Sequence, residues 1–205
     1  MSTSSAPSSI TNSASFLRLA VAGEAGLLLL AWALGRWLDI APLEELRPTL
    51  GNVVWGMAAA VPLLLGLVWM VTSQSGPVRR LVTLVENQLG AVLAGCSLLE
   101  LGTLAAVAGW CEEVLFRGVV QAGLTQWIPE LWALLATSVL FGLVHFASRA
   151  YALFAGVMGL YLGILFVVRD SLLAPIVTHG LYDFVALVYV ARTSRVSPRQ
   201  PRLPA

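Results

Sequence analysis

Charged side chains are scarce in this chain. Only 11% of its 205 residues are Asp, Glu, Lys or Arg, whereas soluble domains carry about 25%. Hydrophobic residues make up 58% of the chain, and the mean hydropathy is +0.84. This deficit of charge, together with repeated long apolar runs, is typical of a protein that crosses a membrane several times.

Three further features are missing or rare. The apolar runs do not alternate with period two, which argues for helices and against a β-barrel. The net charge is only +1, which argues against nucleic acid as a partner. The two cysteines, Cys96 and Cys111, lack the spacing of a zinc site or a disulfide framework. The sequence therefore predicts an all-α, multi-pass transmembrane helix bundle.

About six spans are predicted, each near the ~20 residues that cross a bilayer. They are residues 16–38, 51–73, 98–127, 131–148, 150–168 and 171–191. Residues 16–192 would form a single transmembrane domain. Residues 1–15 are rich in Ser and Thr and are expected to be a disordered tail. Residues 193–205 are expected to form an Arg- and Pro-rich cytoplasmic tail.

Residues 78–97 mix polar and apolar side chains, which fits an amphipathic helix lying in the interface. An extension of the third span, or a seventh span, stays open. With six spans, eight arginines fall on the side that holds both termini and three fall on the other. The positive-inside rule then places both termini in the cytoplasm. We expect a multi-pass protein of the cell membrane, most simply the inner membrane of a bacterium.

The predicted span at 150–168 contains glycines three and four residues apart, at positions 156, 159 and 163. Small residues at this spacing let neighbouring helices approach closely. We interpret them as packing positions inside the bundle and not as a dimer interface.

Ionisable residues nevertheless occur inside the apolar runs. Glu112, Glu113 and Arg117 lie in one predicted span, where each charge costs about 3 kcal/mol on insertion scales. Glu113 and Arg117 are four residues apart and can pair on one helix face. Glu112 points about 100° away from Glu113 and becomes the candidate general base for a water molecule. A single buried ion network of all three is the alternative.

The chain has two histidines, and both lie in apolar runs. His145 follows Phe141 by four residues near the end of the fourth span, where an interfacial histidine near Arg149 is the alternative. His179 and Asp183 are also four residues apart, at mid-span. Asp183 could fix the tautomer of His179, act as a second acid or bind a metal with it. A merely helix-stabilising pair also fits.

Three predicted helices thus each carry carboxylates or imidazoles at membrane depth and must turn them inward. Together, Glu112, His145, His179 and Asp183 suffice to activate a water and stabilise an oxyanion. They could also ligate a divalent metal such as zinc. We favour a metal-free site because no His-Glu-x-x-His helix is present. Hydrolysis of an amide inside the bilayer is the simplest reaction that fits.

The motifs Glu-Glu-x-x-x-Arg, Phe-x-x-x-His and His-x-x-x-Asp follow one another on successive predicted helices. Phe-Arg-Gly follows the glutamates, and Ser-Leu-Leu-Ala-Pro-Ile precedes His179. Over about residues 98–191 this order resembles the CPBP family of glutamate-dependent intramembrane proteases, the CAAX prenyl endopeptidases and bacteriocin-processing (Abi) enzymes. The resemblance implies cleavage of membrane-embedded or membrane-tethered peptides, namely leader, CAAX-like or C-terminal sorting segments.

The resemblance also implies roles for individual residues. It assigns catalysis to Glu112, His145, His179 and Asp183, and supporting roles to Glu113, Arg117 and Phe141. Glu112 would activate the water and His145 would assist it, whereas His179 and Asp183 would support the water and the oxyanion. The family often has Asn where this chain has Asp183. Because an ionised Asp cannot donate a hydrogen bond to an oxyanion, either Asp183 is protonated or His179 alone is the donor.

Two functions of other kinds stay open. A non-enzymatic membrane protein, such as an immunity or scaffold factor, would keep the fold, although intact Glu112, His145 and His179 favour the enzyme. An ion or proton carrier would use these three residues and Asp183 as a relay. Carriers often show inverted repeats with broken helices, and no such repeat is visible in the sequence.

Overall fold

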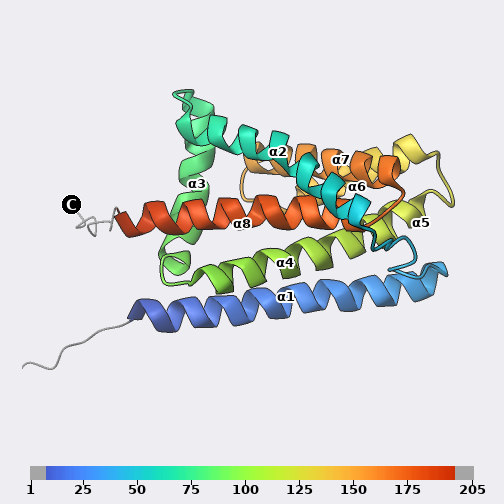
Figure 1. The fold of residues 1–205 in the computed structure, drawn as a ribbon, viewed down its shortest axis with the longest axis horizontal. Helices are drawn as coiled ribbons and strands as arrows, with labels where there is room; N and C mark the ends of the chain where they lie inside the picture. The colour runs from blue at the N-terminus through green and yellow to red at the C-terminus, as the bar shows by residue number, and fades with distance from the viewer. Residues whose placement is uncertain (1–7, 197–205) are drawn as a thin grey trace, which may run out of the picture.

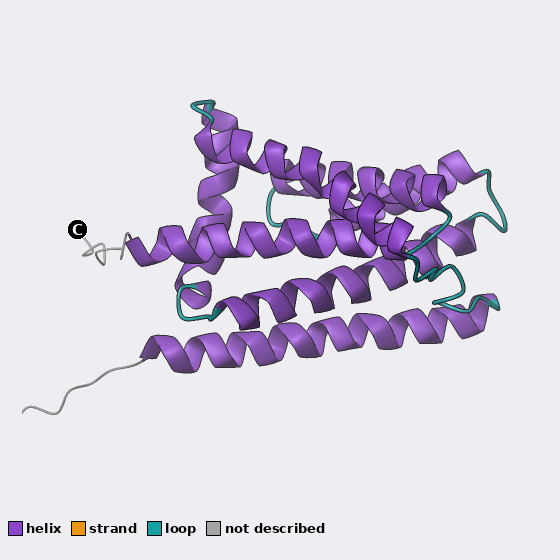
Figure 2. Ribbon diagram, viewed as in Figure 1, coloured by secondary structure: helices purple, strands orange, loops and turns teal. Residues whose placement is uncertain are grey.

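The computed structural model of the chain describes residues 8–196, and every regular element in that range is a helix (Figures 1 and 2). In chain order these are α1 (Ser8–Leu38), α2 (Leu50–Thr72), α3 (Gly76–Leu93), α4 (Leu98–Leu115), the π-helix η1 (Phe116–Gln121), α5 (Ala122–Leu124), α6 (Glu130–Val144), α7 (Arg149–Arg169) and α8 (Leu173–Val196). The predicted all-α bundle is confirmed.

Four helices of the described chain are long and apolar enough to cross a membrane: Ser13–Leu38, Leu50–Thr72, Arg149–Arg169 and Leu173–Arg195. A fifth, α6, is apolar but shorter. The helical path of α4 continues without a break through η1 and α5, and α4 lies between α1 and α8 (Figure 1). These six segments agree approximately with the predicted spans.

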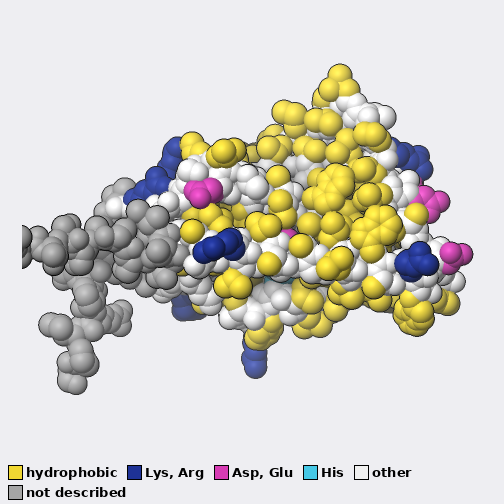
Figure 3. Space-filling view, turned by 90° about the horizontal axis from the view of Figure 1, so that it is seen from below, with side chains coloured by type: hydrophobic (Ala, Val, Ile, Leu, Met, Phe, Trp, Pro, Cys, Tyr) yellow, Lys and Arg dark blue, Asp and Glu magenta, His cyan; other side chains and the backbone are white. Residues whose placement is uncertain are grey.

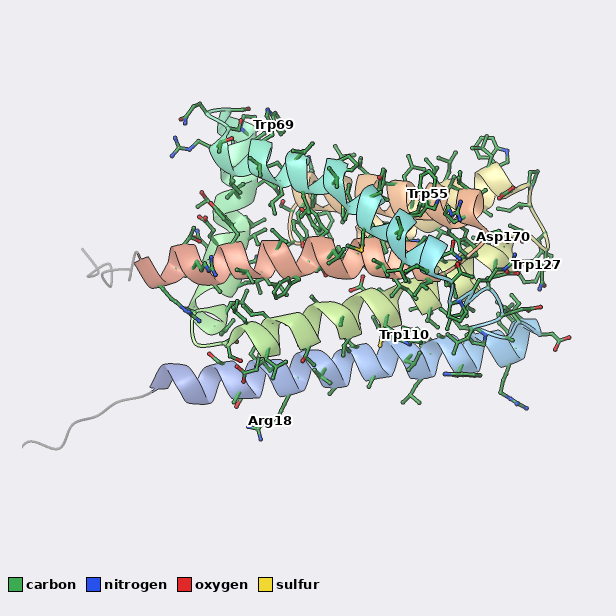
Figure 4. The ribbon with its side chains drawn as sticks, viewed as in Figure 1. Arg18, Trp55, Trp69, Trp110, Trp127 and Asp170 are labelled. Carbon is green, nitrogen blue, oxygen red and sulfur yellow. The ribbon has the colours of Figure 1, made fainter. Side chains whose placement is uncertain are left out.

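The outer surface of the bundle is apolar. Leu99, Leu50 and Trp37 are each exposed over about four-fifths of their surface. Hydrophobic side chains cover the middle of the face drawn in Figure 3, and charged side chains gather toward the two ends of the long axis. The exposed Trp69 and Trp127 lie toward opposite ends (Figure 4), as tryptophans do at the two membrane interfaces. The protein is therefore embedded in a membrane.

Helix α3 runs across the direction of the other long helices, at one end of the bundle (Figure 1). Arg79, Arg80 and Gln88 on this helix are exposed, whereas Leu93 is fully buried. With the long helices crossing the bilayer, this orientation places α3 along the membrane surface. Of the alternatives open for residues 78–97, the interfacial amphipathic helix is the one that fits.

The two ends of the described chain lie at the same end of the bundle (Figure 1) and are held there by hydrogen bonds. Helix α1 begins at Ser8, inside the segment predicted to be disordered, and its buried Ser13 hydroxyl donates to the carbonyl of Val92. Helix α8 continues to Val196, and its Arg195 guanidinium donates to the carbonyls of Ala94 and Cys96, each at 2.6 Å. The remainder of both predicted tails, residues 1–7 and 197–205, lies outside the described residues.

Helices α4 and α8 touch through their backbones. A Cβ atom added to Gly109 would lie 2.9 Å from the backbone nitrogen of Gly180, closer than any side chain can approach. This contact brings the end of α4, with its two glutamates, against the middle of α8. On α7, a Cβ added to Gly159 would lie 3.1 Å from Cβ of Phe141. The close packing predicted for the glycines of this helix is therefore present at Gly159.

Candidate active site

The two glutamates lie in the last turn of α4, where the backbone changes to the π-helix η1. Glu113 is completely buried, and Glu112 is 8% exposed. A π-helical turn inserts an extra residue per turn and often marks a functional position. Arg117 is the second residue of η1, and its side chain is also completely buried.

Glu113 connects two helices through one carboxylate oxygen. Its Oε1 accepts from Nη1 of Arg117 at 2.7 Å and from Nδ1 of His179, on α8, at 2.8 Å. Nη2 of Arg117 donates to the carbonyl of Gly159 on α7 at 2.7 Å. The predicted Glu113–Arg117 pair is present. The bond to His179 was not predicted, and it ties this pair to an imidazole of the site.

The tautomer of His179 follows from this bond. Nδ1 carries a proton because it donates to the Glu113 carboxylate, so Nε2 faces Oδ2 of Asp183 at 3.5 Å. At this distance, as for Glu112 and His145 below, the two groups are not hydrogen-bonded to each other. Nε2 of His179 and the Asp183 carboxylate therefore both face the site.

His145 is positioned by Phe141, one helical turn before it. The two rings stack, with centroids 4.4 Å apart and an interplanar angle of 29°. Nδ1 of His145 donates to the carbonyl of Phe141 at 2.8 Å, and His145 is the C-cap residue directly after α6. The guanidinium of Arg117 lies 4.8 Å from the centre of the Phe141 ring on which His145 stacks. The imidazole therefore presents Nε2 to the site.

Glu112 faces this nitrogen. Its Oε2 is 3.5 Å from Nε2 of His145, which exceeds the 2.7–3.2 Å range, roughly, of an N–H···O bond. Oε2 is buried and has no hydrogen-bond partner. The contact between the two groups is therefore electrostatic, and this carboxylate oxygen is free to accept a hydrogen bond from an incoming donor.

An apolar cavity of about 300 Å³ reaches the cluster of site residues, which runs from Glu112 through His145 and His179 to Asp183. Its wall includes Ala20, Leu104, Ala108, Tyr151, Tyr182 and Asp183. Leu104, Ala108 and Glu112 follow one another at intervals of one turn on the same face of α4. The cavity therefore runs along α4 toward the carboxylate of Glu112, and Asp183 forms part of its wall.

The side chains do not gather as metal ligands. Among the described residues, no three His, Cys, Asp or Glu side chains are placed to hold a metal ion. Nδ1 of His179 is hydrogen-bonded to Glu113 and is not free to bind a metal. The other possible ligands form two separate pairs, Glu112 with His145 and His179 with Asp183, and the facing atoms within each pair are 3.5 Å apart. As arranged, the residues do not fit a zinc ion, and no step of the reaction below is derived through one.

The structure brings all seven predicted site residues together: Glu112, Glu113, Arg117, Phe141, His145, His179 and Asp183. It adds Glu24 of α1, whose Oε2 is buried without a hydrogen-bond partner and whose helix packs against α4. A single acidic residue in the first predicted span was the available signal for Glu24.

Residues 94–185 match the family model described as Type II CAAX prenyl endopeptidase Rce1-like. No curated protein and no solved structure matches the chain. The matched stretch contains every residue of the network from Glu112 to Asp183 and agrees with the CPBP motifs. Residues 94–185 of this chain, the stretch that holds this network, therefore match the Rce1-like type II CAAX prenyl endopeptidase model.

Proposed function

We propose that this protein is an intramembrane endopeptidase that uses Glu112 to activate a water molecule. The observation that carries the proposal is the free, buried Oε2 of Glu112, 3.5 Å from Nε2 of His145. An unpartnered carboxylate at membrane depth is costly and is kept where it has a function. The family whose model matches residues 94–185 is one of proteases.

The reaction needs one base, one carbonyl and one leaving amine. Glu112 takes a proton from a water held between its Oε2 and His145, and the hydroxide adds to the carbonyl carbon of the substrate. The protonated Glu112 then gives this proton to the amide nitrogen as the C–N bond breaks. The products are a carboxylic acid and an amine, and Glu112 is again free to act as a base.

The carbonyl oxygen gains negative charge when the water adds. We assign the donor for this oxyanion to a proton on His179 Nε2 or on Asp183, together with Nε2–H of a protonated His145. Glu113 holds His179 through the 2.8 Å bond and does not face the substrate. It is therefore a positioning residue, as is Arg117, which is bonded to Glu113.

The substrate class follows from where the cavity lies. Its walls are mostly apolar, and it is enclosed by helices whose outer faces are also apolar. Such a cavity suits a peptide that is embedded in the membrane or tethered to it. Leader peptides, CAAX-like tails and C-terminal sorting segments are the candidates. Both chain termini are proposed to lie in the cytoplasm, since most arginines gather on that side.

The test is a comparison of membrane peptides in cells with the protein, without it and with Glu112→Gln. A substrate should be intact in the last two and cleaved in the first. The exposed Glu130 at the start of α6 offers a matched control, because Glu130→Gln is the same chemical change far from the cluster. Identical peptide profiles for wild type and Glu112→Gln would contradict the protease and favour a scaffold of the same fold.

A further inference from the structure

Glu24 is a carboxylate near the middle of a membrane span. It belongs to the segment Ser13–Leu38 of α1, and more than about 15 Å of helix separates it from either end. Its side chain is partly buried, and its Oε2 is buried without a hydrogen-bond partner. Glu24 lies outside residues 94–185, so the family match assigns it no role.

The faces of α1 show where this carboxylate points. Ala20, one turn before Glu24, lines the apolar cavity, and Leu28, one turn after it, packs against the core around Val114 of α4. Glu24 therefore lies on the face of α1 that meets α4, between the cavity and the core. The ionisable residues near enough to influence its charge are Glu112, His145, His179 and Asp183.

Counting the charges of the described cluster leaves Glu24 without a counterion. Arg117 neutralises Glu113 at 2.7 Å. His179 faces Asp183 and His145 faces Glu112, each at 3.5 Å. Even with both imidazoles protonated, the cluster has one carboxylate more than it has cations. We assign the surplus to Glu24, whose Oε2 is buried without a hydrogen-bond partner.

Two sources of a counterion are excluded by position. A lipid ammonium stays at the bilayer surface, more than about 15 Å of helix away from Glu24. A metal ion would need three ligating side chains, and the described residues offer no such group. The remaining ways to neutralise Glu24 are a proton and a cation carried to this depth by an apolar molecule.

We propose that Glu24 binds a positively charged group of the substrate, a Lys or Arg side chain beside the scissile bond. This inference rests on the proposed protease activity. A lysine can lay its four-carbon stem along the apolar cavity wall and place its ammonium at the end of that stem. The carboxylate of Glu24 and the ammonium then neutralise each other where neither is solvated by water. Glu24 thereby determines which peptides are aligned with Glu112.

The first test measures binding without any cleavage. Decylamine and decanol have the same apolar chain and differ only in the charged group, so their effects on the melting temperature are compared in detergent. At ten times its dissociation constant, decylamine should raise the melting temperature of the wild type by about 3–6 °C over decanol. Glu24→Gln should lose this difference, and Glu24→Asp should retain part of it.

Glu86 provides the control within the same cavity. It also lines the cavity, but its Oε1 already accepts from the Tyr189 hydroxyl at 3.3 Å. Glu86→Gln should therefore keep the full decylamine effect. Equal decylamine shifts in the wild type and in Glu24→Gln, or loss of the shift in Glu86→Gln alone, would overturn the assignment of the cation to Glu24.

The second test uses a pool of apolar peptides in which a single Lys occupies each position in turn, and a matched pool with Gln. Wild type should cleave at a fixed distance from Lys, with kcat/KM at least ~10-fold above the Gln pool. Glu24→Gln should lose this preference, so that its kcat/KM values for the Lys pool and the Gln pool become equal. A Lys-to-Gln ratio in Glu24→Gln as large as that of the wild type would overturn the proposal. Failure of the wild type on every peptide would contradict the protease instead, and the decylamine test would still decide the cation site.

Discussion

The buried pair of Glu113 and Arg117 gives the sharpest prediction for stability. Both side chains are completely inaccessible, and Nη1 of Arg117 is 2.7 Å from Oε1 of Glu113. Removing one partner leaves the other charged in a site that has no water. Such changes cost about 3–5 kcal/mol.

The two single variants are not equivalent. Glu113→Gln leaves the Arg117 guanidinium with the Gly159 carbonyl at 2.7 Å but without a carboxylate counterion. Arg117→Met leaves Glu113 with a second partner, because His179 donates to the same Oε1 at 2.8 Å. Glu113→Gln should therefore be the less stable of the two. For a chain of this size, about 3–5 kcal/mol corresponds to a fall in melting temperature of roughly 6–20 °C.

The assay is thermal unfolding in detergent of both single variants and of the double variant Glu113→Gln/Arg117→Met. The double variant removes both charges, so it should recover part of the stability lost by Glu113→Gln. Peptide cleavage measured below the melting temperature tests a second role of Glu113, the positioning of His179, because Glu113→Gln also weakens the hydrogen bond to Nδ1 of His179. We expect its kcat to fall more than that of Arg117→Met.

Two outcomes would refute this reasoning. If both single variants melted at the wild-type temperature, water would have to reach and solvate the Glu113–Arg117 pair. If the double variant were as unstable as the sum of the single changes, the two side chains would not interact.

Two further predictions concern the site and its framework. Asp183→Asn should retain cleavage with and without a strong chelator, since the amide can donate the same hydrogen bond; chelator-sensitive activity with stoichiometric zinc in the wild type would contradict this. Gly109→Ala should destabilise the fold by about 1–3 kcal/mol and slow cleavage, because its Cβ would lie 2.9 Å from the Gly180 backbone nitrogen. Gly102→Ala, whose Cβ would lie 3.6 Å from the Phe184 ring, is the matched control and should be tolerated.

Helix number and the grouping of the site could be predicted from the sequence, because burial in lipid leaves a simple pattern. The apolar runs located the helices to within a few residues at most boundaries. Spacing by four predicted that Glu113 faces Arg117 and that His179 faces Asp183, and both contacts are present. These are local relations within one helix, which periodicity describes well.

Relations between helices were harder to predict. The bond from His179 to Glu113 joins α8 to α4, and its geometry depends on the backbone contact at Gly109 and Gly180. The π-helical turn at Phe116–Gln121 has no simple sequence signal. Glu24 was not included because it stands alone in its span, and only the packing of α1 on α4 brings it toward the site residues.

The prediction of a disordered tail over residues 1–15 did not anticipate tertiary contacts of this segment. Composition alone described residues 1–15 as a tail, yet helix α1 begins at Ser8 and its Ser13 is buried against the end of α3. Serine is neutral to unfavourable within helices, so the Ser-rich composition of residues 1–15 gives no signal that part of this segment is a helix packed on the bundle. The stabilising partner is 79 residues away in sequence.

Water activation by Glu112 is tested most directly by the cleavage rate of the purified Glu112→Gln protein in lipid nanodiscs, with the substrate found in cells. Glutamine keeps the size and polarity of the side chain but cannot take a proton. The rate should fall by at least ~10²-fold, with the melting temperature unchanged and with Glu130→Gln as active as wild type. Cleavage by Glu112→Gln near the wild-type rate would contradict the proposed mechanism.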